Sequence, residues 1–201
     1  MLKVGLTGGL ATGKTHVAGL LGKLGCYVVH ADRLGHEVLL PDGEAYGDVV
    51  AEFGSGIVAA DGTIDRKALA SVVFSNPARL DALNTIVHPH VFRRQNEFFS
   101  AVARKDAHAI VVSEAAIMIE TGSYKRYDRL ILTVCPAEVQ IRRFIEREGA
   151  RDEEARERLA RQIPLDDKKK FADYIIDTSG TKADTEQQVR RVYLQLKKES
   201  R

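Results

Sequence analysis

The 201-residue sequence has few of the features that mark specialised classes of protein. It has only two cysteines, Cys26 and Cys135, and because each lies in an apolar stretch we interpret them as core residues of a reducing compartment. No apolar run approaches the roughly 18 residues of a transmembrane helix, and the N-terminus lacks the apolar segment of a signal peptide. A chain of this length buries roughly 70% of its unfolded surface, so its core needs neither disulfides nor a structural metal. These absences predict a cytoplasmic globular protein of one domain.

An excess of charge of either sign is also missing. Lys and Arg number 30 against 28 Asp and Glu, a formal net charge of +2 that is too small to indicate binding to nucleic acid or to a membrane surface. We therefore expect a small-molecule substrate, with no nucleic-acid partner and no membrane. We also expect a monomer or a small homo-oligomer.

Short apolar runs alternate with helical patterns along the chain. Helical spacing of apolar residues predicts amphipathic helices over 14–24 and 136–148. Buried strands are predicted at 2–6, 26–29, 109–113, 129–134 and 174–177. This alternation is typical of an α/β fold, here a mainly parallel five-stranded sheet covered by helices on both faces to give three layers.

Two segments between predicted strands are longer than a single crossover helix requires. About eighty residues separate the second and third strands, and residues 66–104 read as wholly helical, with Asn76 and Pro77 opening one helix and Pro89 ending it. Residues 149–170 are charged and polar, which is typical of a mobile flap. We therefore predict a single domain over 1–201, with a core of 1–31, 106–148 and 171–201, a helical insert over 32–105 and a flap over 149–170.

A glycine-rich motif follows the first predicted strand and opens the first predicted helix. It matches G-x-x-x-x-G-K-[ST] in full, the signature of a loop whose backbone N–H groups surround a phosphate. An ordinary glycine-rich turn is the alternative. On the phosphate interpretation, Lys14 reaches the β and γ phosphates of a nucleoside triphosphate and the Thr15 hydroxyl binds Mg²⁺. The motif comprises Gly8, Gly9, Leu10, Ala11, Thr12, Gly13, Lys14 and Thr15.

Asp32 follows the second predicted strand, 17 residues beyond Thr15. We expect that strand to adjoin the strand of the phosphate loop, which would direct the carboxylate toward the γ phosphate. An aspartate there can orient an acceptor hydroxyl and take its proton. Alternatively it caps the helix through Leu34 and Val38, and the two roles are compatible.

The order of motifs resembles the dephospho-coenzyme A kinase family. Besides VGLTGGLATGKT and ADRL, the resemblance rests on DGTIDRKALA, LNTIVHPHV, AAIMIETG with Glu120, QIRRFIER, RLARQ and ADYIID, in that order along nearly the whole chain. It implies a P-loop kinase that moves the γ-phosphoryl group of ATP to the ribose 3′-hydroxyl of dephospho-coenzyme A, the last step of coenzyme A synthesis. On this resemblance, the helical insert holds the acceptor and the flap is a lid.

The sequence departs from the family pattern at three places. His30 stands where the family usually has Asp, Ala116 to Met118 where it has Pro-Leu-Leu, and Thr178 where it often has Asn. These changes bear on how the acceptor and the adenine are contacted.

Two arginines and a glutamate complete the candidate residues. Arg143 and Arg147 are four apart on a predicted helix and so share a face, where they can neutralise charge on a phosphoryl group in transfer or simply pair with neighbouring acids such as Glu148. Glu114 follows a predicted buried strand, where it either orients Mg²⁺ through water or caps the turn.

Other nucleotide-binding classes stay open as alternatives. A nucleoside or shikimate-like kinase would share every catalytic part and differ in the insert. A GTP-binding switch has superficial support from DRLG at 32–35 and TKAD at 181–184, but both stand at the wrong places along the chain. We therefore expect ATP rather than GTP.

Overall fold

The computed structural model describes residues 1–74 and 76–201. Contacts divide the chain into two compact units. The first combines Met1–His30 with Ala101–Arg201, and the second is Ala31–Ser100. Each unit has an apolar core of its own.

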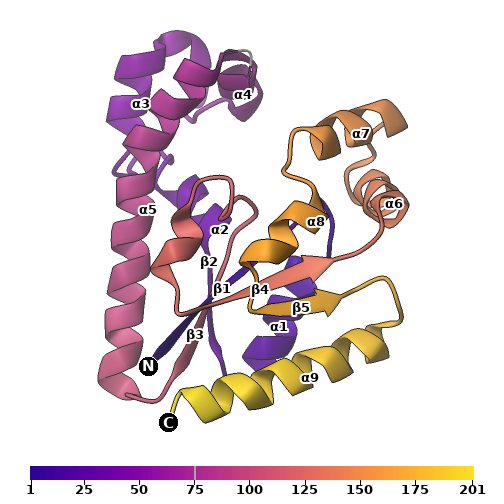
Figure 1. Cartoon of the computed structure of the whole chain (residues 1–201). Coiled ribbons are helices and arrows are strands. Elements are labelled where there is room, and N and C mark those ends of the chain that lie inside the picture. The colour runs from indigo at the N-terminus through magenta and orange to yellow at the C-terminus, as the bar shows by residue number, and fades with distance from the viewer. Residues whose placement is uncertain (75) are drawn as a thin grey trace. The chain divides into compact units, whose positions relative to one another are not determined.

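The first unit is built on a five-stranded sheet in which every pairing is parallel (Figure 1). The strand order is β2-β3-β1-β4-β5, so β1 occupies the centre. The strands are β1 (Leu2–Gly8), β2 (Tyr27–His30), β3 (Ile110–Glu114), β4 (Arg129–Val134) and β5 (Tyr174–Asp177). The α/β prediction and its five strands are confirmed, and the sheet is wholly parallel.

One prediction about this sheet is wrong. The strand before Asp32 does not adjoin the phosphate-loop strand, because β3 lies between β2 and β1. The burial of the two strands gives the reason: every residue of β3 is buried, whereas only one residue of β2 is. A fully buried strand needs paired neighbours on both sides, and a half-exposed strand tolerates the edge. The carboxylate that adjoins β1 is therefore Glu114, whose backbone pairs with Leu6.

Helices cover the sheet of this unit. α1 (Lys14–Lys23) and α9 (Lys182–Glu199) lie side by side under one face, as Figure 1 shows. Their apolar stripes, including Val17, Leu21, Val189 and Leu196, pack on strand residues such as Leu6. The other helices of the unit are α6 (Ala137–Glu148), α7 (Asp152–Ala160), α8 (Leu165–Lys168) and two 3-10 turns, η2 (Ser123–Arg126) and η3 (Lys169–Phe171).

The TKAD fragment has a local structural role in this unit. Thr181 is the N-cap of α9, and its hydroxyl accepts from the Asp184 N–H at 3.1 Å. Asp184 in turn accepts from the Thr181 N–H at 2.9 Å. This reciprocal capping box satisfies two amides at the helix start, so these residues serve helix initiation.

The second unit is helical. It contains α2 (Ala31–Glu37), α3 (Tyr46–Phe53), η1 (Ser55–Ile57), α4 (Arg66–Phe74) and most of α5 (Pro77–Lys105). Its core is formed mainly by valines and leucines, among them Val38, Val49, Leu69, Val87 and Val91. The DRLG fragment lies inside α2. As predicted, α5 begins at Pro77, where the Asn76 side chain accepts from the Ala78 N–H at 3.0 Å.

The prediction that Pro89 ends a helix is wrong, because α5 runs through it over 29 residues. A proline inside a helix removes the hydrogen bond to the carbonyl four residues earlier and costs about 3 kcal/mol. Val87 and Val91, on either side of Pro89, are buried in the core of the second unit. Burial of such side chains gives roughly 1.5–3 kcal/mol each, which offsets the local cost.

Among the described residues, no helix is long and apolar enough to cross a membrane. This includes α5, whose length would suffice but whose apolar residues are interrupted by charged and other polar ones.

Candidate nucleotide site

The loop between β1 and α1 has a backbone that requires glycine. Gly13 has a φ of +81°, in the left-handed region, and Ala11 has a φ of +49°. At Gly8 an added Cβ would lie 2.2 Å from Thr133 Oγ1, and at Gly9 it would lie 2.6 Å from Gln140 Oε1. Real Cβ atoms do not approach neighbours so closely. A Cβ at Gly8 would also lie 2.8 Å from the backbone oxygen of Thr133, so this position requires glycine, whereas at Gly9 the end of the Gln140 side chain would have to move.

Hydrogen bonds of buried threonines connect the loop to the ends of the neighbouring strands. Thr12 Oγ1 lies 3.0 Å from Gly9 O and 2.8 Å from Thr133 Oγ1. Thr133 Oγ1 also lies 3.3 Å from Thr7 O, and Thr178 Oγ1 donates to Thr12 O at 2.9 Å. Thr133 was missed by the sequence analysis. The only local signal for it is a hydroxyl that follows the apolar run Leu130 to Leu132 near the end of its strand.

The start of α1 supplies the charge that a phosphate needs. Gly13 precedes the helix and has no side chain to cap its first amides, so these N–H groups carry the partial positive charge of the helix. The Lys14 ammonium donates to Gly9 O at 2.9 Å and so lies across the loop. A loop of backbone donors with an ammonium beside it is a site for an anion.

Thr15 and Glu114 bring two oxygen donors together beside the loop. The Thr15 hydroxyl donates to Glu114 Oε1 at 2.8 Å. Hydroxyl and carboxylate oxygens are the hard ligands that Mg²⁺ prefers, so these residues fit that ion. The other carboxylate oxygen, Oε2, contacts His30 Nδ1, and the three side chains form a continuous chain.

The two arginines of α6 have different surroundings. Arg143 donates to Thr178 O at 2.7 Å and to Thr178 Oγ1 at 3.1 Å, and these hydrogen bonds connect α6 to the end of β5. Because Thr178 Oγ1 also donates to Thr12 O, Arg143 is connected to the phosphate loop through Thr178. Arg147 pairs with Glu148 at 2.8 Å, and 61% of its side chain is exposed. Their roles toward a nucleotide stay predictions.

The segment predicted as a flap contacts the phosphate loop. Gln162, between α7 and α8, accepts from the Leu10 N–H at 2.8 Å. The same segment also contacts the region after β3. At the end of α8, Lys168 Nζ is 2.6 Å from Glu120 Oε1, and the lysine side chain is fully buried. Whether the segment moves as a lid stays a prediction.

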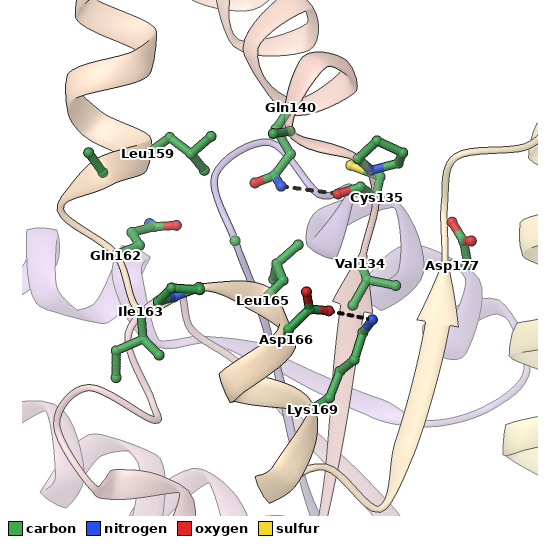
Figure 2. A pocket seen from close by; sticks show the side chains of 15 residues that line it. Val134, Cys135, Gln140, Leu159, Gln162, Ile163, Leu165, Asp166, Lys169 and Asp177 are labelled. Atoms are coloured by element: carbon green, nitrogen blue, oxygen red, sulfur yellow. Dashed lines mark hydrogen bonds and ion pairs between the residues drawn. The ribbon is translucent and has the colours of Figure 1, made fainter.

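A cavity of about 560 Å³ opens beside Gly9, between the carboxyl ends of β4 and β5 and the segment from α7 to α8 (Figure 2). Its walls are largely apolar, with Val134, Leu159 and Leu165 among them. Gln140 donates to Cys135 O at 3.1 Å, and burial raises the pKa of the Cys135 thiol. The Asp166 and Lys169 pair, 2.8 Å apart, lines one side.

Asp32 belongs to the second unit. It is the second residue of α2, inside the first turn, where the helix dipole favours a carboxylate. His36, one turn further along, accepts at Nε2 from Arg66 at 2.6 Å. Burial first, and Arg66 second, lower the pKa of His36, while Asp32 acts in the opposite direction.

A parallel sheet with a phosphate loop on its central strand and an arginine-bearing helix after β4 defines the class of P-loop kinases. A shikimate kinase from Bacteroides thetaiotaomicron shares this fold, with a TM-score of 0.51 and 14% identity over 97% of this chain and 98% of that one. Closer likeness comes from sequence: the family model for dephospho-CoA kinase matches residues 2–193. The chain belongs to the dephospho-CoA kinase family.

Individual relatives agree with this assignment. The dephospho-CoA kinase of Syntrophus aciditrophicus is 39% identical over 201 residues, which is all of this chain and 86% of the relative. That of Geobacter metallireducens is 41% identical over 189 residues, 94% of each chain. A crystal structure of a Thermus thermophilus protein has a TM-score of 0.84 at 32% identity, covering 96% of this chain and 97% of that one.

Proposed function

We propose that this chain transfers the γ-phosphoryl group of ATP to the ribose 3′-hydroxyl of dephospho-CoA, giving CoA and ADP. The observation that carries the proposal is membership of the dephospho-CoA kinase family over residues 2–193. The nucleotide side of the site supports it, since the phosphate loop, the helix start and Lys14 lie in one compact unit. The two buried free cysteines, Cys26 and Cys135, accord with a reducing cytoplasm.

The triphosphate binds to the backbone amides of residues 8–15, and Lys14 exchanges Gly9 O for the β and γ phosphate oxygens. The Thr15 hydroxyl would hold Mg²⁺ directly, and Glu114, which accepts from that hydroxyl, would orient the ion through water. When bound, this ion neutralises charge that develops on the phosphates. The chain itself supplies position and electrostatics, which account for most of the catalysis of phosphoryl transfer.

On the acceptor side, Asp32 orients the 3′-hydroxyl and takes its proton as the new oxygen to phosphorus bond forms and the β–γ bridge bond breaks. Arg143 and Arg147 neutralise charge on the phosphoryl group in transfer. The helical insert, residues 32–105, holds the acceptor, and residues 149–170 close as a lid that excludes water.

The test is incubation of the protein with Mg-ATP and a panel of acceptors. We expect ADP and CoA from dephospho-CoA, and no phosphorylation of shikimate or of nucleosides. Transfer to shikimate or a nucleoside with none to dephospho-CoA would overturn the proposal. A tenfold preference for GTP over ATP in competition would overturn the nucleotide assignment, about 1.4 kcal/mol of discrimination.

The role of Lys14 is tested by Lys14→Ala, which removes charge stabilisation in the transition state and should lower kcat by at least about 100-fold. Lys23→Ala, at the exposed end of the same helix, is the matched control and should keep full activity. Equal activity of the two variants would reject the role of Lys14.

A further inference from the structure

The contact between His30 and Glu114 is built by the sheet. His30 ends β2 and Glu114 ends β3, and the two residues are paired in the register of these parallel strands. Paired residues on neighbouring strands project to the same face. Nδ1 of the imidazole therefore meets Glu114 Oε2 while the opposite oxygen, Oε1, accepts from Thr15.

The direction of this hydrogen bond follows from the chemistry of the two groups. A carboxylate oxygen accepts hydrogen bonds, so the donor in this contact is the Nδ1–H group of His30 and the acceptor is Oε2. The Glu114 side chain is 9% exposed, against 41% for His30. A carboxylate so buried depends on protein donors to satisfy its oxygens, and His30 and Thr15 each satisfy one of them.

We propose that His30 is a positioning residue for the magnesium ion of the bound nucleotide, acting through Glu114. The inference rests on the proposed function, which places that ion at Thr15. With a donor on Oε2, the carboxylate keeps the orientation in which Oε1 faces the Thr15 hydroxyl. Loss of the donor leaves Oε2 unsatisfied, and Glu114 then turns toward other partners. In other metal sites, residues that hydrogen-bond to a metal ligand fix its orientation in the same way.

The experiment measures ADP binding by calorimetry with excess chelator and again with Mg²⁺. The ratio of the two affinities is the magnesium gain. In His30→Leu we expect the gain to fall by at least about tenfold, or 1.4 kcal/mol, and the affinity measured in chelator to stay within about twofold of wild type. His30→Asn should keep the gain within about threefold, because its side-chain amide N–H takes the place of Nδ1–H.

Four results would overturn the role of His30. They are an undiminished gain in His30→Leu, equal loss of the gain in the Asn and Leu variants, a parallel loss of affinity in chelator, and a wild-type protein that binds ADP equally with and without Mg²⁺. The last would leave the proposed phosphoryl transfer standing. A wild-type protein that does not bind ADP at all would overturn the proposed function and, with it, the role of His30. If His30→Leu does not fold, His30→Gln replaces it, since its amide lies one bond too far out and should not restore the gain.

Discussion

At the scale of single residues, the shape of the phosphate loop depends on glycines, whose lack of a Cβ atom lets neighbouring side chains approach the backbone. Gly8 leaves room for the Thr133 hydroxyl, and Gly9 leaves room for the Gln140 amide. The hydroxyls of Thr12 and Thr133 then hold the loop carbonyls and each other beneath the phosphate site. These contacts form without any ligand, and a loop preorganised in this way binds at a lower entropy cost.

We predict that Gly8→Ala destabilises the protein by about 1–3 kcal/mol, because the methyl group overlaps Thr133 Oγ1 and the backbone carbonyl of Thr133. ADP affinity should fall as well. Gly19→Ala is the control: on α1 an added methyl has no described atom within 4 Å, and Ala in a helix stabilises by about 0.5–1 kcal/mol. Urea unfolding of both variants checks the pair, and equal stability of the two would contradict the prediction.

His36 should titrate below its ordinary pKa of 6.5, because burial and the nearby Arg66 disfavour its charged form. The unfolded state then binds more protons than the folded one, so stability is lost as pH falls from 6.5 through the folded pKa. Arg66→Ala should move the pKa of His36 upward in an NMR titration of the imidazole, though burial keeps it below the ordinary value. No upward movement would contradict the role of Arg66.

At the scale of elements, α8 is fixed by one buried charge. Lys168 is fully buried, and its ammonium faces the Glu120 carboxylate in an ion pair rather than in an aligned hydrogen bond. Paired buried charges add little net stability, whereas an unpaired one is costly. The pair therefore fixes where α8 sits in the first unit.

Glu120→Ala should cost about 3–5 kcal/mol in denaturant unfolding, because it leaves the Lys168 ammonium buried without its counter-charge. Adding Lys168→Met should recover most of this loss. Asp167→Ala serves as the control, since it breaks an exposed pair with Lys170 that contributes about 1 kcal/mol or less. Failure of the second substitution to restore stability would show that packing, and not charge, explains the first.

Gln162 accepts a hydrogen bond from the Leu10 amide and so links the predicted lid to the loop. Gln162→Leu should speed hydrogen exchange at this amide by about fivefold, which corresponds to the loss of one hydrogen bond of about 1 kcal/mol. Amides of α7 should also exchange faster. Gln187→Leu, on the exposed side of α9, should change neither. Unaltered exchange at Leu10 would show that the contact does not protect this amide in solution.

At the scale of the whole molecule, the chain distributes its chemistry over two compact units. The phosphate loop, Thr15, Glu114 and Arg143 belong to the first, and Asp32 belongs to the second. If the proposed roles hold, nucleotide binding belongs to the first unit and proton transfer by Asp32 to the second.

We predict that Asp32→Asn lowers kcat by about 10²–10⁴-fold, as expected for loss of a general base, while ADP affinity stays within about twofold. Asp42→Asn, an exposed carboxylate of the same unit, should leave kcat unchanged. Steady-state kinetics with calorimetry checks both, and full kcat in Asp32→Asn would reject the base assignment.

Much was predictable from the sequence because its signals are local. The apolar runs predict all five strands, Asn76 and Pro77 predict the start of α5, and the spacing of Gly8, Gly13 and Lys14 predicts the phosphate loop. Each depends on residues only a few positions apart, through backbone conformation or side-chain periodicity. The family resemblance adds the order of such signals along the chain.

Tertiary structure decided the rest. The insertion of β3 between β2 and β1 brings Glu114 to Thr15 and His30 to Glu114 across 99 and 84 residues of chain. The helix through Pro89 depends on burial of its neighbours. Strand order and such pairings come from which surfaces long-range packing buries, and no local pattern encodes that choice.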